Sequence, residues 1–306
     1  MKTNYRIRNT LGWYVILLIP MIGTLVFSLY PLIQTILNSF HNAAGDFVGF
    51  SNYKILAADS DFRQSMGNTI YMGILGLALN IPIAFIVANM INSIPRAKGI
   101  YKTVILLPII MSMVTVSLMF KFIFSADPNS VANSILRIFG MEPRSWFSDP
   151  NMSREMVVLM NLWKNLGYNV ILFLAGLQNV PTELYEAADV DGAGTVRKWI
   201  SITIPSMRNS FTFVFINMSI NVLKRFTDVY AVGSEFGDPA GSLQTIMLYI
   251  YRNSFSTRFS KDLGAASAAS VVLFLLIIII TIINLKSTEN TNKDKKSFRK
   301  RLKGGV

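Results

Sequence analysis

The stretch Leu177–Asn209, which reads LQNVPTELYEAADVDGAGTVRKWISITIPSMRN, is a hydrophilic segment between two long apolar runs. Pro181 suits the first position of a helix, where its missing N–H costs nothing. Gly192 ends that helix, because glycine readily adopts the left-handed conformation found at helix C-termini. Thr195 can cap a second short helix, and Pro205 ends it. The segment therefore predicts two short helices separated by a glycine turn.

The first of these helices has one acidic flank and one flank of small side chains. Glu183, Glu186 and Asp189 recur at three-residue spacing, and Ala187 and Ala188 lie beside them. Such a helix can be a surface helix that lies against the rest of the chain. It can also be a docking helix, because small alanines permit close approach and an acidic flank suits a basic groove on a partner.

The rest of the chain is dominated by apolar runs. Of its 306 residues, 52% are hydrophobic and only 15% are charged, well below the quarter expected of a soluble protein. A helix needs about 20 apolar residues to cross a bilayer, and six runs are long enough. They are Leu11–Leu37, Thr69–Ile91, Ile100–Phe124, Met156–Leu177, Phe211–Val232 and Leu263–Leu285. We therefore predict an all-α integral membrane protein with six transmembrane helices.

Basic residues indicate the orientation. The N-terminus, the second-to-third loop, the fourth-to-fifth loop and the C-terminal tail together hold about twice as many Lys and Arg residues as the opposite loops. Both termini are therefore predicted to be cytoplasmic, in a multi-pass protein of the bacterial cell membrane. The first apolar run is longer than a signal-peptide core and shows no clear cleavage site, so we interpret it as a retained span.

Several polar side chains fall inside the fourth and fifth predicted spans. Charged groups at membrane depth are costly and are therefore functional candidates. One interpretation is hydrogen bonding between helices, with a Lys224–Asp228 pair. The other is a polar cavity that binds a hydroxyl-rich solute, in which an aromatic ring stacks on the solute. The candidates for this cavity are Trp163, Lys164, Asn165, Tyr168, Asn169, Asn217, Asn221, Lys224, Arg225 and Asp228.

Catalytic and cofactor motifs are absent from the sequence. It has no phosphate-binding loop of the G-x-x-x-x-G-K-S/T type and no G-x-S-x-G motif. It has no cysteine, and its single histidine, His41, rules out a histidine-rich metal cluster. We therefore expect no catalytic residue, no metal site and no cofactor on this chain.

The docking segment resembles a known motif. Glu186-Ala187-Ala188, Gly192 and, after nine intervening residues, Ile202-Thr203-Ile204-Pro205 are similar to the EAA motif of bacterial binding-protein-dependent ABC importers. Ile204 stands where the motif usually has leucine, which conserves volume. The residues Asp191-Gly192-Ala193 and Trp199 further resemble the carbohydrate-uptake branch of these importers.

The resemblance implies a type I ABC importer permease, in which the loop helix is a coupling helix that seats in a separate ATPase subunit. The coupling residues implied are Glu183, Glu186, Ala187, Ala188, Asp189, Asp191, Gly192 and Pro205. The partners implied are a second related permease, two cytosolic ATPase subunits that use ATP, and an extracytoplasmic solute-binding protein. The solute implied is a sugar or a related hydroxyl-rich compound.

The predicted organisation divides the chain into four parts. These are a cytoplasmic N-terminal segment (1–10), a first span with an outer loop (11–65), a permease core (66–285, with the EAA-like loop at 178–209) and a basic cytoplasmic tail (286–306). Two other functions stay open at this point. One is an ion-gradient-driven carrier or channel with a coincidental loop, and the other is a membrane enzyme, for which the sequence offers no catalytic set.

Overall fold

The computed structural model describes residues 14, 16–94, 98–258 and 261–303, with side chains up to residue 287. Within these ranges the chain is almost entirely helical, and its extended structure is a single bridge between His41 and Phe47. The predicted all-α class is therefore confirmed. The N-terminal segment 1–10 and the start of the first predicted span at Leu11 lie outside the described residues.

The chain forms two compact units. The smaller unit comprises Met1–Asp59 and Ile250–Val272. It contains η1 (Leu25–Leu29), α2 (Tyr30–Asn38), α3 (Ser51–Ala58) and parts of α14 (Ile246–Phe255) and α15 (Leu263–Lys303). The buried Asn52 amide donates to the carbonyls of Ser39 (2.8 Å) and His41 (2.9 Å), which fixes the turn after α2.

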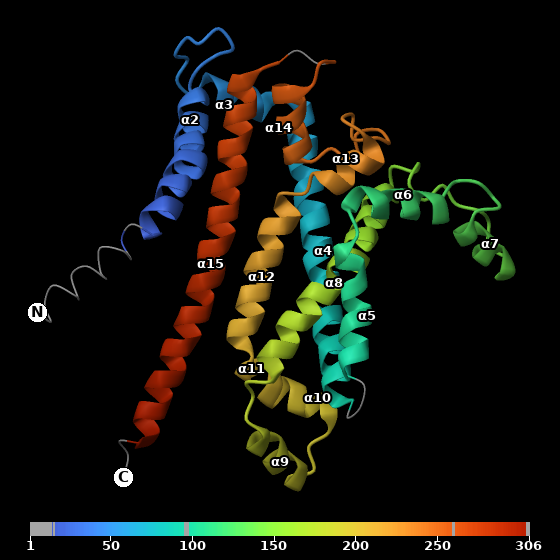
Figure 1. Ribbon diagram of the computed structural model, residues 1–306, viewed down its shortest axis with the longest axis vertical. Coiled ribbons are helices and arrows are strands. Elements are labelled where there is room, and N and C mark those ends of the chain that lie inside the picture. The colour runs from blue at the N-terminus through green and yellow to red at the C-terminus, as the bar shows by residue number, and fades with distance from the viewer. Residues whose placement is uncertain (1–13, 15, 95–97, 259–260, 304–306) are drawn as a thin grey trace, which may run out of the picture. The chain divides into compact units, whose positions relative to one another are not determined.

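The larger unit comprises Ser60–Tyr249 and Leu273–Val306. Its helices are α4 (Ser60–Ser93), α5 (Lys98–Ile110), α6 (Met113–Ile123), α7 (Val131–Ile138), α8 (Ser153–Leu177), α9 (Thr182–Val190), α10 (Thr195–Lys198), η2 (Trp199–Thr203), α11 (Ile204–Ser206), α12 (Arg208–Leu223) and α13 (Thr227–Gly233), with the remaining parts of α14 and α15. α4 and α8 form the most extensive helix pair, and α5 and α12 pack on them. α9 and α10 lie at one end of this unit, and α6 and α13 lie toward the other (Figure 1).

Four described helices are long and apolar enough to cross a bilayer: Ile16–Asn38, Ser60–Ser93, Ser153–Leu177 and Leu263–Ser287. α5 and α6 make a fifth if they are one broken span. α12 has 16 residues, fewer than the roughly 20 that a straight span needs. The chain therefore has several membrane-length helices, and the count of six stays a prediction.

The third predicted span, Ile100–Phe124, is not one helix. α5 and α6 meet at a bend of 95°. Pro108 removes a backbone donor near the end of α5. The Ser112 hydroxyl then accepts from the Thr115 N–H (3.1 Å) and caps a new helix. Apolar composition alone did not reveal this break.

The fifth predicted span, Phe211–Val232, is also divided. α12 ends at Leu223 and α13 begins at Thr227. The intervening backbone is held because the Thr245 hydroxyl donates to the Arg225 carbonyl (3.0 Å). Most of the basic tail belongs to α15, which continues to Lys303. Its sequence is rich in Lys and Arg, which favour helix, and has no glycine or proline before Gly304.

Candidate functional site

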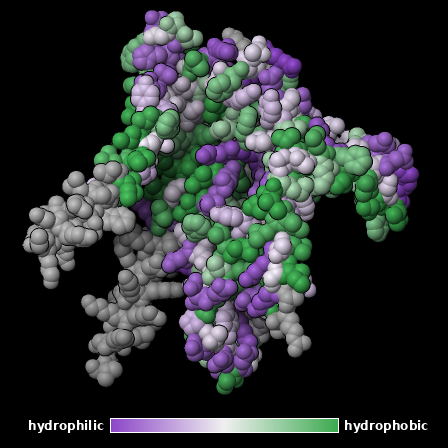
Figure 2. Space-filling model, viewed as in Figure 1, coloured by the Kyte–Doolittle hydropathy of each residue, from purple (hydrophilic) through white to green (hydrophobic). Residues whose placement is uncertain are grey.

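The larger unit has two separate apolar cores, and a polar layer lies between them. The part of α8 that belongs to the first core comprises residues 156–158 and 160, and the part that belongs to the second core comprises residues 170, 173, 174 and 177. The intervening turns of α8 carry Asn161, Asn165 and Asn169, four residues apart and therefore on one face. Figure 2 shows a group of hydrophilic residues among hydrophobic ones on the visible face.

This layer opens into a cavity of about 300 Å³, the lower end of the range for small-molecule sites. It lies between α8, α12 and the break that precedes α13. The lining residues are Met113, Asn161, Asn165, Tyr168, Asn169, Asn217, Met218, Asn221, Val222, Lys224, Arg225, Phe226, Thr227 and Asp228. Eight of the ten residues predicted for a cavity are therefore brought together.

The two other candidates point elsewhere. The Trp163 ring packs against Phe120 with centroids 5.7 Å apart. The Lys164 ammonium donates to the Ile109 carbonyl (3.0 Å) at the C-terminal end of α5. Lys164 therefore satisfies a backbone acceptor that the α5–α6 break leaves without a helical partner.

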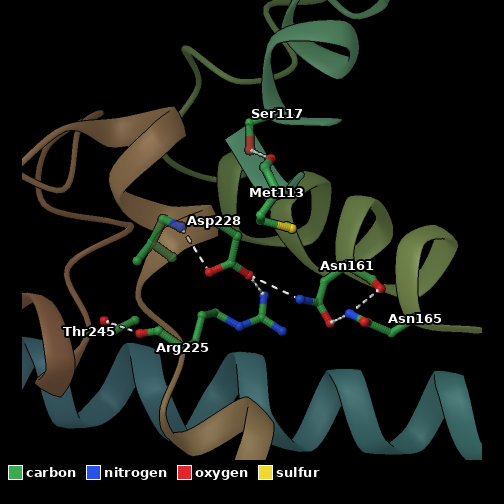
Figure 3. A network of polar contacts seen from close by, with 8 residues as sticks. Met113, Ser117, Asn161, Asn165, Arg225, Asp228 and Thr245 are labelled. Carbon is green, nitrogen blue, oxygen red and sulfur yellow. Dashed lines mark hydrogen bonds and ion pairs between the residues drawn. The ribbon is translucent and has the colours of Figure 1, made fainter. Parts of the chain in front are cut away.

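An ion pair forms one wall of the cavity (Figure 3). Arg225 Nη1 lies 3.4 Å from Asp228 Oδ2, and the two side chains are only 2% and 4% exposed. The Asn161 amide donates to the same carboxylate oxygen (3.2 Å), and the Val229 N–H donates to the other (2.9 Å). The predicted Lys224–Asp228 pair is therefore wrong, because α12 ends at Leu223 and the break turns Arg225, not Lys224, toward Asp228.

Five asparagine side chains supply most of the remaining polar lining. The Asn169 amide donates to Asn80 Oδ1 of α4 (2.8 Å), and the Asn221 amide donates to Asn217 Oδ1 (2.9 Å). The Asn165 amide donates both to the Asn161 backbone carbonyl (3.1 Å) and to Asn161 Oδ1 (3.2 Å). Each primary amide has two donors and a two-lone-pair acceptor. In the described structure, the Asn165 side-chain oxygen and further donors and acceptors of Asn169, Asn217 and Asn221 are therefore left for a ligand rich in hydroxyl groups.

Asn161 and Thr227 were missed by sequence reasoning. Asn161 stands four residues before Asn165, so helical spacing from Asn165 and Asn169 would have found it. Thr227 could not be found in this way, because its place depends on the break between α12 and α13.

The docking segment forms α9, a turn, and a second helical stretch. Ala193 N–H donates to the Ala188 carbonyl (2.9 Å) and Gly192 N–H to the Asp189 carbonyl (3.1 Å), which is the Schellman pattern. Gly192 has φ +69°, so the predicted glycine turn is present. Pro181 precedes the helix as its N-cap instead of occupying its first position.

Two details of the second stretch differ from expectation. Thr195 makes no side-chain cap, and the N-cap residue is Gly194. Pro205 does not end the helix. It stands in the first turn of α11 after the π-helical η2, where its missing N–H is tolerated, and the helical backbone continues to Ser206.

Most of the predicted coupling residues are exposed on α9 and its turn. Glu183, Glu186, Ala187, Asp191 and Gly192 are exposed, as is Pro205 farther along. Ala188 is buried, so it packs inward. Asp189 is exposed but forms an ion pair with Lys198 of α10, which leaves Glu183, Glu186 and Asp191 as the acidic coupling residues without such a pair in the described structure.

α9 is linked to the membrane-length helices through aromatic and polar contacts. The Tyr185 hydroxyl lies 2.9 Å from the hydroxyl of the fully buried Thr203. The Trp199 ring packs on Phe85 of α4 with centroids 5.7 Å apart, and Phe85 packs on Phe173 of α8 at 5.9 Å. A force on α9 can therefore reach α4 and α8 through packed side chains.

Several membrane-length helices, a polar cavity beside one of them and an exposed helical loop at one end of the larger unit are features expected of a membrane transport protein. The chain belongs to the family "Binding-protein-dependent transport system inner membrane component", whose model matches residues 80–286. The predicted family is therefore confirmed: this is an ABC importer permease subunit.

Curated relatives agree. The chain is 34% identical over 251 residues to the lactose transport system permease protein LacF of Rhizobium radiobacter, which covers 80% of this chain and 83% of LacF. It is 33% identical over 236 residues to the arabinooligosaccharides transport system permease protein AraP of Bacillus subtilis (strain 168), with 76% and 75% covered.

Solved structures show the same fold. A chain of a bacterial ABC transporter involved in the import of the acidic polysaccharide alginate superimposes with a TM-score of 0.77 at 22% identity. The match covers 95% of this chain and 99% of that chain. The predicted type I permease fold is therefore confirmed.

Proposed function

We propose that this permease moves a sugar or a related hydroxyl-rich solute inward, by alternating access driven by a separate ATPase subunit. The observation that carries the proposal is the asparagine-lined cavity between two apolar cores. Amides match hydroxyl groups in both donors and acceptors, and the apolar cores on either side hold the helices around them. The curated relatives that transport lactose and arabinooligosaccharides support this solute class.

The ATPase would bind at α9. Glu183 and Glu186 would face basic residues of its groove, and Ala187 would permit close approach. Movement of α9 would pass through Tyr185 and Thr203 to η2, and from Trp199 to α4 and α8. ATP would be consumed on the partner subunit, because this sequence has no phosphate-binding loop.

The complex would contain a second related permease, two ATPase subunits and an extracytoplasmic solute-binding protein. A transporter structure of this fold has been solved with an alginate pentasaccharide-bound periplasmic protein. The excess of Lys and Arg on the α9 side and in the tail supports cytoplasmic termini in the bacterial cell membrane.

Co-purification tests the coupling assignment. The tagged chain is expressed with its neighbouring gene products and compared with Glu186→Lys on α9 and with Glu142→Lys, whose site between α7 and α8 is also exposed. We expect wild type and Glu142→Lys to retain the ATPase and its solute-stimulated hydrolysis, and Glu186→Lys to lose both. Retention of the ATPase by Glu186→Lys would refute the docking assignment.

A further inference from the structure

The charged side chains that line the cavity carry one more positive charge than negative charge. Lys224, Arg225 and Asp228 are its charged lining residues in the described structure. Arg225 and Asp228 are buried and paired with each other, so their charges cancel. The cavity is therefore left with the single positive charge of Lys224.

The Lys224 ammonium has neither a hydrogen-bond acceptor nor an ion-pair partner in the described structure, and its side chain is exposed. Two other lysines of the larger unit differ from it, because Lys121 donates to the Val232 carbonyl (3.2 Å) and Lys164 donates to the Ile109 carbonyl (3.0 Å). Lys224 falls within the predicted fifth span, and a charged side chain in such a segment is by default a candidate for a functional role.

The position of Lys224 also favours a ligand. The residue follows the last turn of α12, and its backbone N–H donates to the Ile220 carbonyl (3.1 Å). Its main chain is therefore held, while its side chain lines the same cavity as the Asn217 and Asn221 amides. An ammonium on a fixed backbone beside hydroxyl-binding amides is suited to a solute that combines hydroxyl groups with an anion.

We propose that Lys224 is a specificity-determining residue, which selects a hydroxyl-rich solute that carries one anionic group. This inference rests on the proposed function. The anion is a carboxylate, a phosphate or a sulfonate, because a lysine ammonium acts as a point charge and does not require the planar geometry that arginine matches. Arg225 does not contribute to the selection, because Asp228 already neutralises it.

The test uses the assembled complex with its binding protein in nanodiscs and measures solute-stimulated ATP hydrolysis. The probes are matched pairs: uronic-acid oligosaccharides and their neutral methyl esters, together with unmodified neutral oligosaccharides. The variants are Lys224→Gln, Lys224→Arg and the control Lys121→Gln. Lys121 is also a lysine of the larger unit, but it does not line the cavity.

For wild type, we expect the acidic probes to stimulate at lower concentration than their esters. Lys224→Gln should raise the half-maximal concentration of the acidic probe by about tenfold or more, since hydrogen bonds to charged groups contribute that much. It should leave the ester unchanged. Lys224→Arg should retain the preference, as should Lys121→Gln. If Lys224 only stabilised the end of α12, Lys224→Gln would change the half-maximal concentrations of the acidic probe and of its ester equally.

Three results would overturn the inference. Equal stimulation by acid and ester in wild type would show that the cavity does not select charge, while the proposed function would stand. Loss of the second permease from the Lys224→Gln complex would place Lys224 in the contact between permeases. No stimulation by any probe in a complex that contains its ATPase would contradict the proposed function as well.

Discussion

Replacement of Asp228 by asparagine tests the polar wall of the cavity. The change keeps the shape of the side chain and an oxygen that can accept from the Val229 N–H, but it removes the charge that faces Arg225. Arg225 would then be an uncompensated cation with a 2% exposed side chain. Removal of one partner from a buried pair costs about 3–5 kcal/mol.

The matched control is Asp189→Asn on α9. Asp189 also forms an ion pair, with Lys198, but its side chain is 65% exposed. An exposed pair contributes only about 0.2–1 kcal/mol. The two variants therefore remove the same charge from sites that differ in burial.

Thermal unfolding of the purified chain in detergent is the assay. At roughly 2 °C per kcal/mol for a chain of this size, Asp228→Asn should lower Tm by roughly 6–10 °C and Asp189→Asn by less than about 2 °C. The double change Arg225→Gln with Asp228→Asn should lose less than the single change, because no unpaired charge remains. A Tm for Asp228→Asn equal to that of the surface control would refute the reasoning.

Three further changes test other parts of the structure. Gly167→Ala would place a Cβ only 1.9 Å from a backbone carbonyl oxygen of α5, so thermal unfolding should show that the variant is less stable by about 1–3 kcal/mol or more. The control Gly73→Ala, whose Cβ would have its nearest neighbour at 3.7 Å, should change stability little. Gly192→Ala would put a side chain on a residue with φ +69°, which costs about 1–2 kcal/mol, so the variant should pull down less ATPase. The control variant Gly194→Ala, whose Cβ would lie in open space at φ −67°, should pull down the normal amount. Tyr185→Phe should leave ATPase binding intact but lower solute-stimulated hydrolysis, because it removes the hydrogen bond between α9 and η2; undiminished stimulation would contradict the proposed link.

The sequence predicted the parts of the fold that depend on local pattern. The apolar runs located α4, α8 and the apolar part of α15, and the glycine at 192 located the end of α9. The EAA-like residues identified the family. Hydropathy and residue preference are sufficient for such features, because each depends on a few neighbouring residues.

The missed features depend on contacts between distant segments. The third and fifth predicted spans continue across Ser112 and Arg225, yet the helix is interrupted at both positions, because Ser112 caps α6 and Arg225 is held by Asp228 and Thr245. The same break decides which cation pairs with Asp228. The link from Tyr185 to Thr203 likewise joins residues 18 positions apart, which helical spacing does not reveal.

Solute uptake by proteoliposomes tests the central claim most directly. The complete complex is reconstituted with ATP or a non-hydrolysable analogue inside, and the entry of a radiolabelled probe that stimulates hydrolysis is followed with and without ionophores. The account predicts uptake that requires ATP and the ATPase subunit and that ionophores leave unchanged. Uptake by this chain alone, driven by an ion gradient and abolished by ionophores, would contradict it.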